Sequence, residues 1–190
     1  MKIKYNQNRK ANAFTLIEMI GVLAVIAILA ALLIPKVFEA INNARVNNTI
    51  VSYNTVKAAC IDHYAKFGAI DKTANGVTLT AAQLAAYDTT LLSEGFLDKP
   101  FIIKVGTNSF VQVTNTASYL LDGTINATSN ATYVVEAVIQ GVPYADAKDI
   151  NDRLDSDKAP FTFPASGTAD NAGRVKWDGS SALHIYLSHR

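Results

Sequence analysis

The sequence contains a single cysteine, Cys60, among its 190 residues. A lone cysteine excludes an intrachain disulfide, so no bridge staples the fold and the redox compartment cannot be inferred from cysteine usage. His63 follows one helical turn later, but no further pair of metal-binding side chains stands nearby, which argues against a zinc site. We interpret Cys60 as a small apolar residue on a helix.

An excess of charge of one sign is also missing. The chain has 17 Lys and Arg against 16 Asp and Glu, a formal net charge of +1, so no specific nucleic-acid partner is predicted. It has no Ser-His-Asp spacing, no glycine-rich phosphate loop and no Cys-x-x-Cys pair. These absences argue against an enzyme.

What the sequence does contain is a long apolar run from Phe14 to Ile34. Thirteen of these residues are Leu, Ile, Val or Phe, each of which favours membrane insertion by about 0.3–0.6 kcal/mol. A helix over this run is about 31 Å long, which matches the hydrocarbon core of a bilayer. Residues 1–13 carry four basic side chains and no acid, so the positive-inside rule keeps this end in the cytoplasm.

The apolar run contains one carboxylate, Glu18. An acid in a membrane-length helix is costly and usually marks a site that has a partner. The alternative is an unpaired acid that extends to the membrane interface. Pro35 follows the run and removes a backbone N–H, which predicts a kink or a loosened stretch of helix.

The start of the run resembles the prepilin signature of type IV pilins and type II secretion pseudopilins: a basic leader precedes Ala13-Phe14-Thr15-Leu16-Ile17-Glu18, and a long apolar helix follows. The resemblance implies that a prepilin peptidase cuts between Ala13 and Phe14 and methylates the new amine of Phe14. It also implies that Glu18 pairs with the Phe14 amine of a neighbouring subunit and sets the register of assembly. The family usually has Gly at the position of Ala13, and its members commonly have a helix-disrupting proline at the position of Pro35.

After Pro35 the apolar residues return at helical spacing, which predicts an amphipathic helix that ends at Gly68. Its expected apolar stripe consists of Val37, Ile41, Ala44, Ile50, Tyr53, Val56, Cys60 and Tyr64. The predicted organisation is a cleaved basic leader (1–13), a transmembrane or filament-core helix (14–35), its amphipathic continuation (36–68) and a globular α+β head (69–190).

The sequence of the head, residues 69–190, predicts a mixture of helices and strands. Thr80 and Gln83 form a capping-box pattern that predicts a short helix through about Leu92, and Pro143 begins a helix through Leu154. Strands are predicted at 101–105, 109–113, 118–121, 133–139, 174–177 and 182–187, the first four as an antiparallel meander. The fold class is therefore α+β and pilin-like, with a long N-terminal helix packed on an antiparallel sheet.

Acidic residues cluster at Asp146, Asp149, Asp152, Asp155 and Asp157. Some pseudopilins hold Ca²⁺ in this region, which makes Asp152, Asp155 and Asp157 the candidate ligands. The spacing does not fit the EF-hand pattern, so a solvated helix face and loop is the preferred interpretation and no cofactor is expected.

We therefore predict a structural subunit of a type IV pilus-like filament, a helical homopolymer built by the inner-membrane assembly platform together with other pilins. Before assembly the chain is expected to cross the inner (cytoplasmic) membrane once, with its N-terminus in the cytoplasm. It then enters an extracellular pilus or, in the alternative of a secretion pseudopilin, a periplasmic pseudopilus. A membrane-anchored periplasmic binding domain or enzyme is the third alternative.

Overall fold

The computed structural model describes residues 14–73, 75–121, 127–128, 132–155, 163–169 and 172–190. In chain order the elements are α1 (Leu16–Phe67), α2 (Ala81–Ala85), α3 (Tyr87–Ser93), β1 (Asn108–Thr114), β2 (Val134–Gln140), α4 (Tyr144–Leu154), β3 (Val175–Trp177) and β4 (Leu183–His189). Contacts divide the chain into two compact units, with the boundary between Asn42 and Asn43. We call residues 14–42 the N-terminal unit and Asn43–Arg190 the head.

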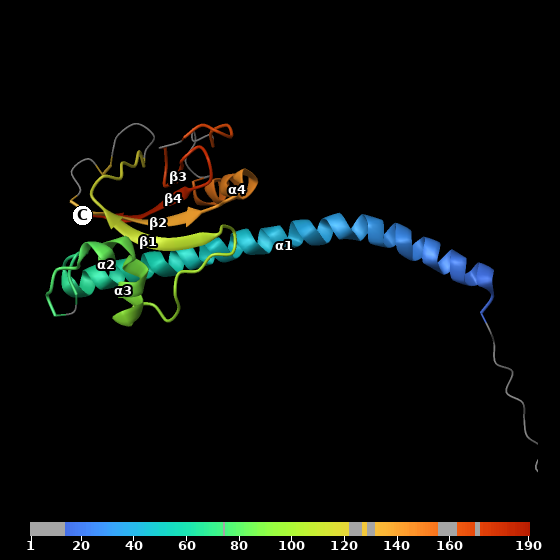
Figure 1. Ribbon diagram of the computed structural model, residues 1–190, viewed down its shortest axis with the longest axis horizontal. Coiled ribbons are helices and arrows are strands. Elements are labelled where there is room, and N and C mark those ends of the chain that lie inside the picture. The colour runs from blue at the N-terminus through green and yellow to red at the C-terminus, as the bar shows by residue number, and fades with distance from the viewer. Residues whose placement is uncertain (1–13, 74, 122–126, 129–131, 156–162, 170–171) are drawn as a thin grey trace, which may run out of the picture. The chain divides into compact units, whose positions relative to one another are not determined.

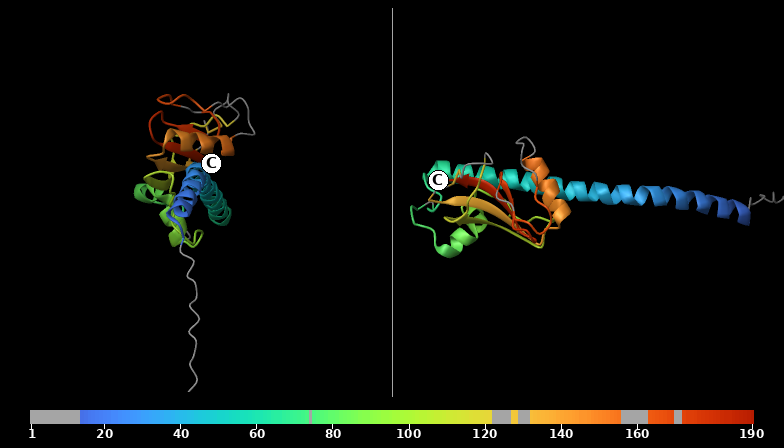
Figure 2. Two further views of the ribbon diagram at one scale, coloured as in Figure 1. Left: turned by 90° about the vertical axis from the view of Figure 1, so that its right-hand side faces the viewer. Right: turned by 90° about the horizontal axis from the view of Figure 1, so that it is seen from above.

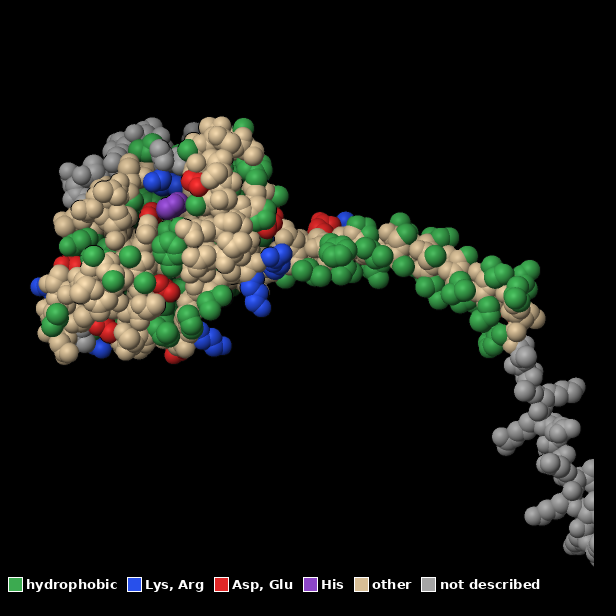
Figure 3. All heavy atoms as spheres, in the orientation of Figure 1, with side chains coloured by type: hydrophobic (Ala, Val, Ile, Leu, Met, Phe, Trp, Pro, Cys, Tyr) green, Lys and Arg blue, Asp and Glu red, His purple; other side chains and the backbone are tan. Residues whose placement is uncertain are grey.

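The described part of the N-terminal unit is the first half of α1. Its most apolar window of 18 residues has a mean hydropathy of 2.8, and none of that window is buried, so α1 is long and apolar enough to cross a membrane. Hydrophobic side chains cover this stretch of the helix (Figure 3). The helix continues through Pro35, which cannot donate a hydrogen bond to the carbonyl of Ala31. The kink at Pro35 stays a prediction.

In the head, the second half of α1 packs on the sheet through one narrow stripe. Apart from the adjacent pair Ala59 and Cys60, the buried residues recur every three or four positions along α1: Val46, Thr49, Tyr53, Val56, Ala59, Cys60 and His63. The predicted stripe is thus right at Tyr53, Val56 and Cys60, whereas Val37 and Ile41 are exposed. Gly68 ends the helix with a φ of 70°, the left-handed conformation in which helices commonly end and which glycine adopts without strain.

The four strands form one antiparallel sheet in the order β1-β2-β4-β3 (Figure 1). On one face, apolar residues such as Val111, Ala137 and Ile185 join the same core as the buried stripe of α1. Because side chains alternate along a strand, their neighbours Gln112, Glu136 and others face the opposite side. The expected α+β architecture is confirmed: the long helix packs against a four-stranded antiparallel sheet.

Two predicted strands are wrong. Residues 101–105 alternate between buried and exposed as a strand would, but they form no ladder, because the Ile103 N–H donates to the Ser109 side chain at 3.0 Å instead. Residues 118–121 contribute only one isolated bridge, between Leu120 and Ala172. The simple meander is wrong as well, because β2 pairs with β4 and the chain forms α4 and β3 between them.

Helices α2 and α3 contact β1, the edge strand of the sheet (Figures 1 and 2). Helix α2 begins with the predicted capping box, since the Thr80 and Gln83 side chains each bond the other's backbone N–H. Asp88 of α3 is buried, and its Oδ1 accepts a hydrogen bond from the Val111 N–H of β1 at 3.2 Å. A side chain therefore occupies an edge N–H that could otherwise pair with another chain.

We predict that Asp88→Ala destabilises the head by about 1–3 kcal/mol, because it leaves the buried Val111 N–H without its acceptor. Burial raises the pKa of Asp88, so a neutral amide of the same shape suits the site, and Asp88→Asn should stay within about 1 kcal/mol of the wild type. Thermal unfolding of the full chain in detergent, followed by circular dichroism, measures both. Equal melting temperatures for the two variants would contradict the role of the side-chain oxygen as the acceptor for the Val111 N–H.

Candidate functional site

The first turn of α1 is closed by a reciprocal pair of side chains, Thr15 and Glu18. Glu18 Oε2 accepts hydrogen bonds from the Thr15 backbone N–H at 2.8 Å and from the Thr15 hydroxyl at 2.7 Å. In return, the Glu18 N–H donates to Thr15 Oγ1 at 3.3 Å. Thr15 directly precedes the first residue of α1, so this arrangement is a capping box with Thr15 as the N-cap.

The capping box uses only one of the two carboxylate oxygens. Both hydrogen bonds to the side chain end on Oε2, and Glu18 Oε1 makes none within the residues that the structure describes. The side chain of Glu18 is exposed. One oxygen thus stabilises the helix start, while the other can accept a hydrogen bond or a cation from outside the chain.

Thr15 is the residue that the sequence analysis missed. The pattern Thr-x-x-Glu at Thr15 and Glu18 is the same capping signature that predicted the start of α2 at Thr80. The signal is therefore present in the sequence, whereas the prediction for Glu18 named no side-chain partner within the chain. The structure gives this acid an internal partner as well.

The other residues of the predicted processing site lie around this cap. Phe14 directly precedes Thr15, and 76% of its surface is exposed. Ala13 and the leader, residues 1–13, lie outside the described residues. Cleavage between Ala13 and Phe14, methylation of Phe14 and the register role of Glu18 stay predictions.

The candidate Ca²⁺ ligands have separate structural partners. Asp152 on α4 forms an ion pair with Lys148 at 2.5 Å. Asp155 is buried at the end of α4, where its Oδ2 accepts the backbone N–H groups of Arg174 and Val175 at 2.8 and 3.0 Å and so holds the start of β3. Asp157 lies outside the described residues. Across the described parts of the chain, no group of three or more His, Cys, Asp or Glu side chains is placed to hold a metal ion.

His63 joins a buried aromatic cluster rather than a metal site. Its Nδ1 lies 2.9 Å from the Tyr87 hydroxyl, and its Nε2 lies 3.1 Å from Glu94 Oε2. The rings of Phe67 and Phe96 contact its own ring edge to face. Both ring nitrogens therefore face a polar group of the same chain, and the cluster joins α1 to α3 and the segment that follows it.

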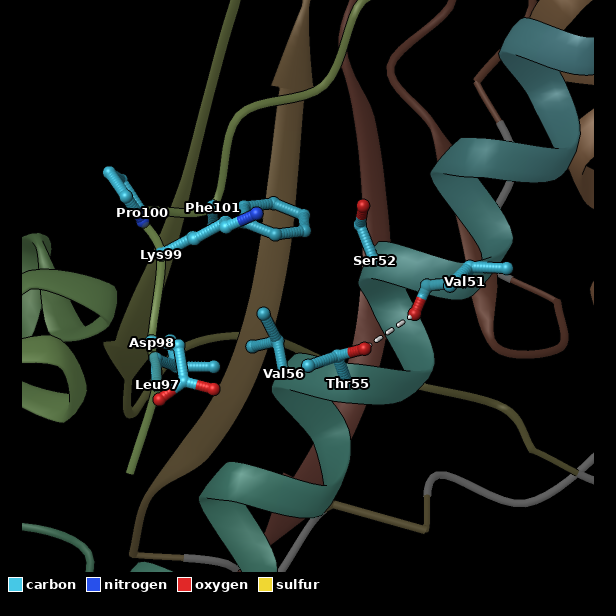
Figure 4. Close-up of a pocket in the computed structure, with 9 residues that line it drawn as sticks. All are labelled: Val51, Ser52, Thr55, Val56, Leu97, Asp98, Lys99, Pro100 and Phe101. Carbon is cyan, nitrogen blue, oxygen red and sulfur yellow. Dashed lines mark hydrogen bonds between the residues drawn. The ribbon is translucent and has the colours of Figure 1, made fainter. Parts of the chain in front are cut away.

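A surface groove of about 410 Å³ lies between α1 and the segment 97–101. Side chains from the two segments line it, and the Thr55 hydroxyl donates to the Val51 carbonyl at 3.0 Å (Figure 4). Its charged side chains are Asp98 and Lys99, and neither a histidine nor a cysteine lines it. The groove is thus lined mainly by apolar and small polar side chains, with Asp98 and Lys99 as its charged residues.

An exposed apolar helix that starts at a capped acid and continues into an α+β head defines a pilin-like protein. Residues 8–34 match the family model of the prokaryotic N-terminal methylation motif, which is the signature of type IV pilins and pseudopilins. No curated protein and no solved structure matches the chain.

The motif indicates the class of protein, its processing and its attachment to a membrane. It indicates a structural pilin-type protein, a class that is usually non-enzymatic. It implies processing by prepilin peptidase and assembly with other pilins. The motif and the apolar helix together suit a protein that is anchored in a membrane before assembly.

We predict that Thr15→Val loosens the first turn of α1, because valine has no oxygen to accept the Glu18 N–H. An N-cap of this kind contributes about 1 kcal/mol, so amide hydrogens of the first turn should exchange roughly fivefold faster. Hydrogen exchange of the full chain in detergent micelles measures the change. Thr15→Ser keeps the hydroxyl and serves as the matched control, and equal exchange in the two variants would refute the cap.

Proposed function

We propose that this chain is the subunit of a type IV pilus-like filament, and that the first half of α1 is both its membrane anchor and its assembly element. Prepilin peptidase cuts between Ala13 and Phe14 and methylates the new amine. The inner-membrane platform then moves the subunit from the bilayer into a helical homopolymer. The proposal assigns no cofactor to the filament.

The observation that carries the proposal is the uncovered apolar surface of the N-terminal unit. Leu16 and Ile17 are 78% and 77% exposed, and large apolar side chains remain exposed along the helix as far as Ile41. A contiguous apolar surface of this size marks contact with a membrane or with other protein chains. Lipid covers it before assembly, and equivalent helices of other subunits cover it in the filament.

The geometry of Glu18 supports its proposed role in setting the register. The capping box holds the side chain at the helix start through Oε2 and leaves Oε1 for a second partner. Cleavage before Phe14 creates a cationic amine of the kind that such an oxygen binds. Each subunit would then contribute one acid and one amine, and the pairing of acid to neighbouring amine would recur at every step of the helix.

The charge of the leader supports the proposed topology. The basic side chains of residues 1–13 keep the leader in the cytoplasm, where cleavage takes place, and the head lies on the other side of the membrane. The subunit would therefore span the cytoplasmic membrane once before it enters the pilus.

A periplasmic pseudopilus is the second candidate. Many type IV pilins close a C-terminal loop with a disulfide, and a chain whose only cysteine is Cys60 cannot do so. Whether filaments made of this chain lie outside the cell or within the periplasm decides between the two candidates. Immunogold labelling of intact and of permeabilised cells shows this directly.

We predict that the mature chain begins with N-methylated Phe14. Its mass should equal that of residues 14–190 plus one CH₂ unit, because the methyl group replaces an amine hydrogen, and a fragment spectrum should place the methyl group on the amine. Intact-mass spectrometry of protein isolated from membranes or from filaments measures both. An uncleaved chain in assembled filaments would contradict the proposal.

We predict that Glu18→Gln lowers the yield of filaments by about tenfold while membrane insertion is unchanged. Glutamine at this position still completes a capping box, so the substitution removes the charge and keeps the helix start. Sheared filaments and the membrane fraction are quantified by immunoblot in a host that supplies the assembly machinery.

Two further variants separate the charge from the cap. Thr15→Val keeps the acid but removes the hydroxyl that accepts the Glu18 N–H, and Glu18→Ala removes both the charge and the hydrogen bonds of the carboxylate. If the charge sets the register, the yield with Glu18→Gln should be close to that with Glu18→Ala and well below that with Thr15→Val. Normal yield with Glu18→Gln would show that the charge has no role in assembly.

A further inference from the structure

A polar cleft lies on the face of the sheet that does not pack on α1. It has a volume of about 380 Å³ and is lined by side chains of all four strands, among them Gln112, Glu136, Lys176 and His184. In the sheet, Gln112 is the direct partner of Glu136, and Lys176 is the direct partner of His184. Direct cross-strand partners project from the same face, so these four side chains meet above the sheet.

Glu136 is the fixed centre of this group. It is buried, and it accepts hydrogen bonds from Gln112 Nε2 at 2.6 Å and from the Tyr119 hydroxyl at 2.6 Å. Burial alone would raise the pKa of Glu136, but hydrogen bonds from His184, Tyr119 and Gln112 outweigh it and hold the pKa below its usual value. The carboxylate is thus ionised at neutral pH and fully engaged by its neighbours.

Glu136 also orients His184. Nδ1 of His184 lies 3.2 Å from Glu136 Oε1, and within the described residues no hydrogen bond occupies Nε2. A carboxylate on one ring nitrogen fixes the direction of the ring and directs the other nitrogen to a ligand, as in many histidine sites. In the protonated form of the ring, this second nitrogen is a donor.

Lys176 supplies a second donor beside His184. Its ammonium group lies 4.7 Å from the centre of the Tyr119 ring, and it has no carboxylate partner among the residues that the structure describes. Asp178 also lines the cleft, but its carboxylate accepts the backbone N–H groups of Ser180, Ser181 and Ala182. The carboxylates of the cleft therefore have hydrogen-bond partners within the chain, whereas the Lys176 ammonium group and Nε2 of His184 are available to a ligand.

We propose that this cleft binds a small oxyanion, the carboxylate or phosphate group of a soluble ligand, between Lys176 and His184. The Lys176 ammonium is a donor, and His184 Nε2 is a second donor when an anion binds to the protonated ring, so the complementary ligand is an acceptor that carries negative charge. The cleft belongs to the head and lies on the opposite face of the sheet from α1, so the inference is independent of the proposed assembly role of the first helix half.

The test is a titration of the full chain in non-ionic detergent micelles, with histidine labelled by ¹⁵N, at constant ionic strength. The probes are sodium phosphate, sodium glucuronate and glucose, the last as the neutral relative of glucuronate. We expect the ring nitrogens of His184 to shift and saturate with phosphate, with glucuronate or with both, but not with glucose. The oxyanion that saturates identifies the group as phosphate or carboxylate.

Lys176→Gln should weaken this binding by about tenfold, because it removes the permanent charge from the cleft. Lys148→Gln is the matched control, since it removes the same charge from α4, where Lys148 pairs with Asp152 outside the cleft. Equal affinity in the two variants, saturation with glucose, or no saturable shift with either oxyanion would overturn the proposal. Filament yield with Lys176→Gln should stay normal, which separates this inference from the assembly function.

Discussion

The exposed apolar surface of the N-terminal unit, from Phe14 to Ile41, constrains the whole chain, because lipid or other protein chains must cover it. Buried residues of α1 begin only at Val46, and from there they form one narrow stripe. A single helix thus carries two patterns: it is apolar on all sides in its first half and on one side in its second. No break separates the two patterns, because Pro35 is accommodated within the helix.

The capping box at Thr15 and Glu18 suits a helix that begins in apolar surroundings. A helix that starts in or beside lipid exposes backbone N–H groups that water cannot satisfy there. Glu18 Oε2 and the Thr15 hydroxyl satisfy the N–H groups of Thr15 and Glu18 within the chain. The one acid of the apolar run therefore has a structural reason to stay beside the helix start, before any other subunit is considered, and one oxygen is left for contact with a neighbour.

The sequence allowed those features to be predicted that depend on residues close together in the chain. The end of α1 at Gly68, the start of α2 at Thr80 and the α+β fold class followed from spacing and turn chemistry. The site at Phe14 and Glu18 came from the resemblance to the prepilin signature, and it stays a prediction. The strand predicted at 101–105 failed because a side chain, Ser109, replaced the backbone ladder that alternation alone suggests. The burial of Glu136 could not be predicted from the local sequence. The partners that stabilise its buried carboxylate, Tyr119 and His184, are 17 and 48 residues away in sequence.

The sheet topology explains how the head closes without a disulfide. Strand β4 is the last element of the chain, yet it lies inside the sheet and pairs with β2 on one side and β3 on the other. Beyond it, Arg190 exchanges both backbone hydrogen bonds with Tyr133, and its guanidinium lies 4.2 Å from the Tyr64 ring centre on α1. The Tyr53 hydroxyl also donates to the Tyr186 carbonyl at 2.8 Å. Strand β4 is thus paired on both sides from Leu183 to Ile185, and its C-terminal end is held by β2, by Tyr133 and by α1.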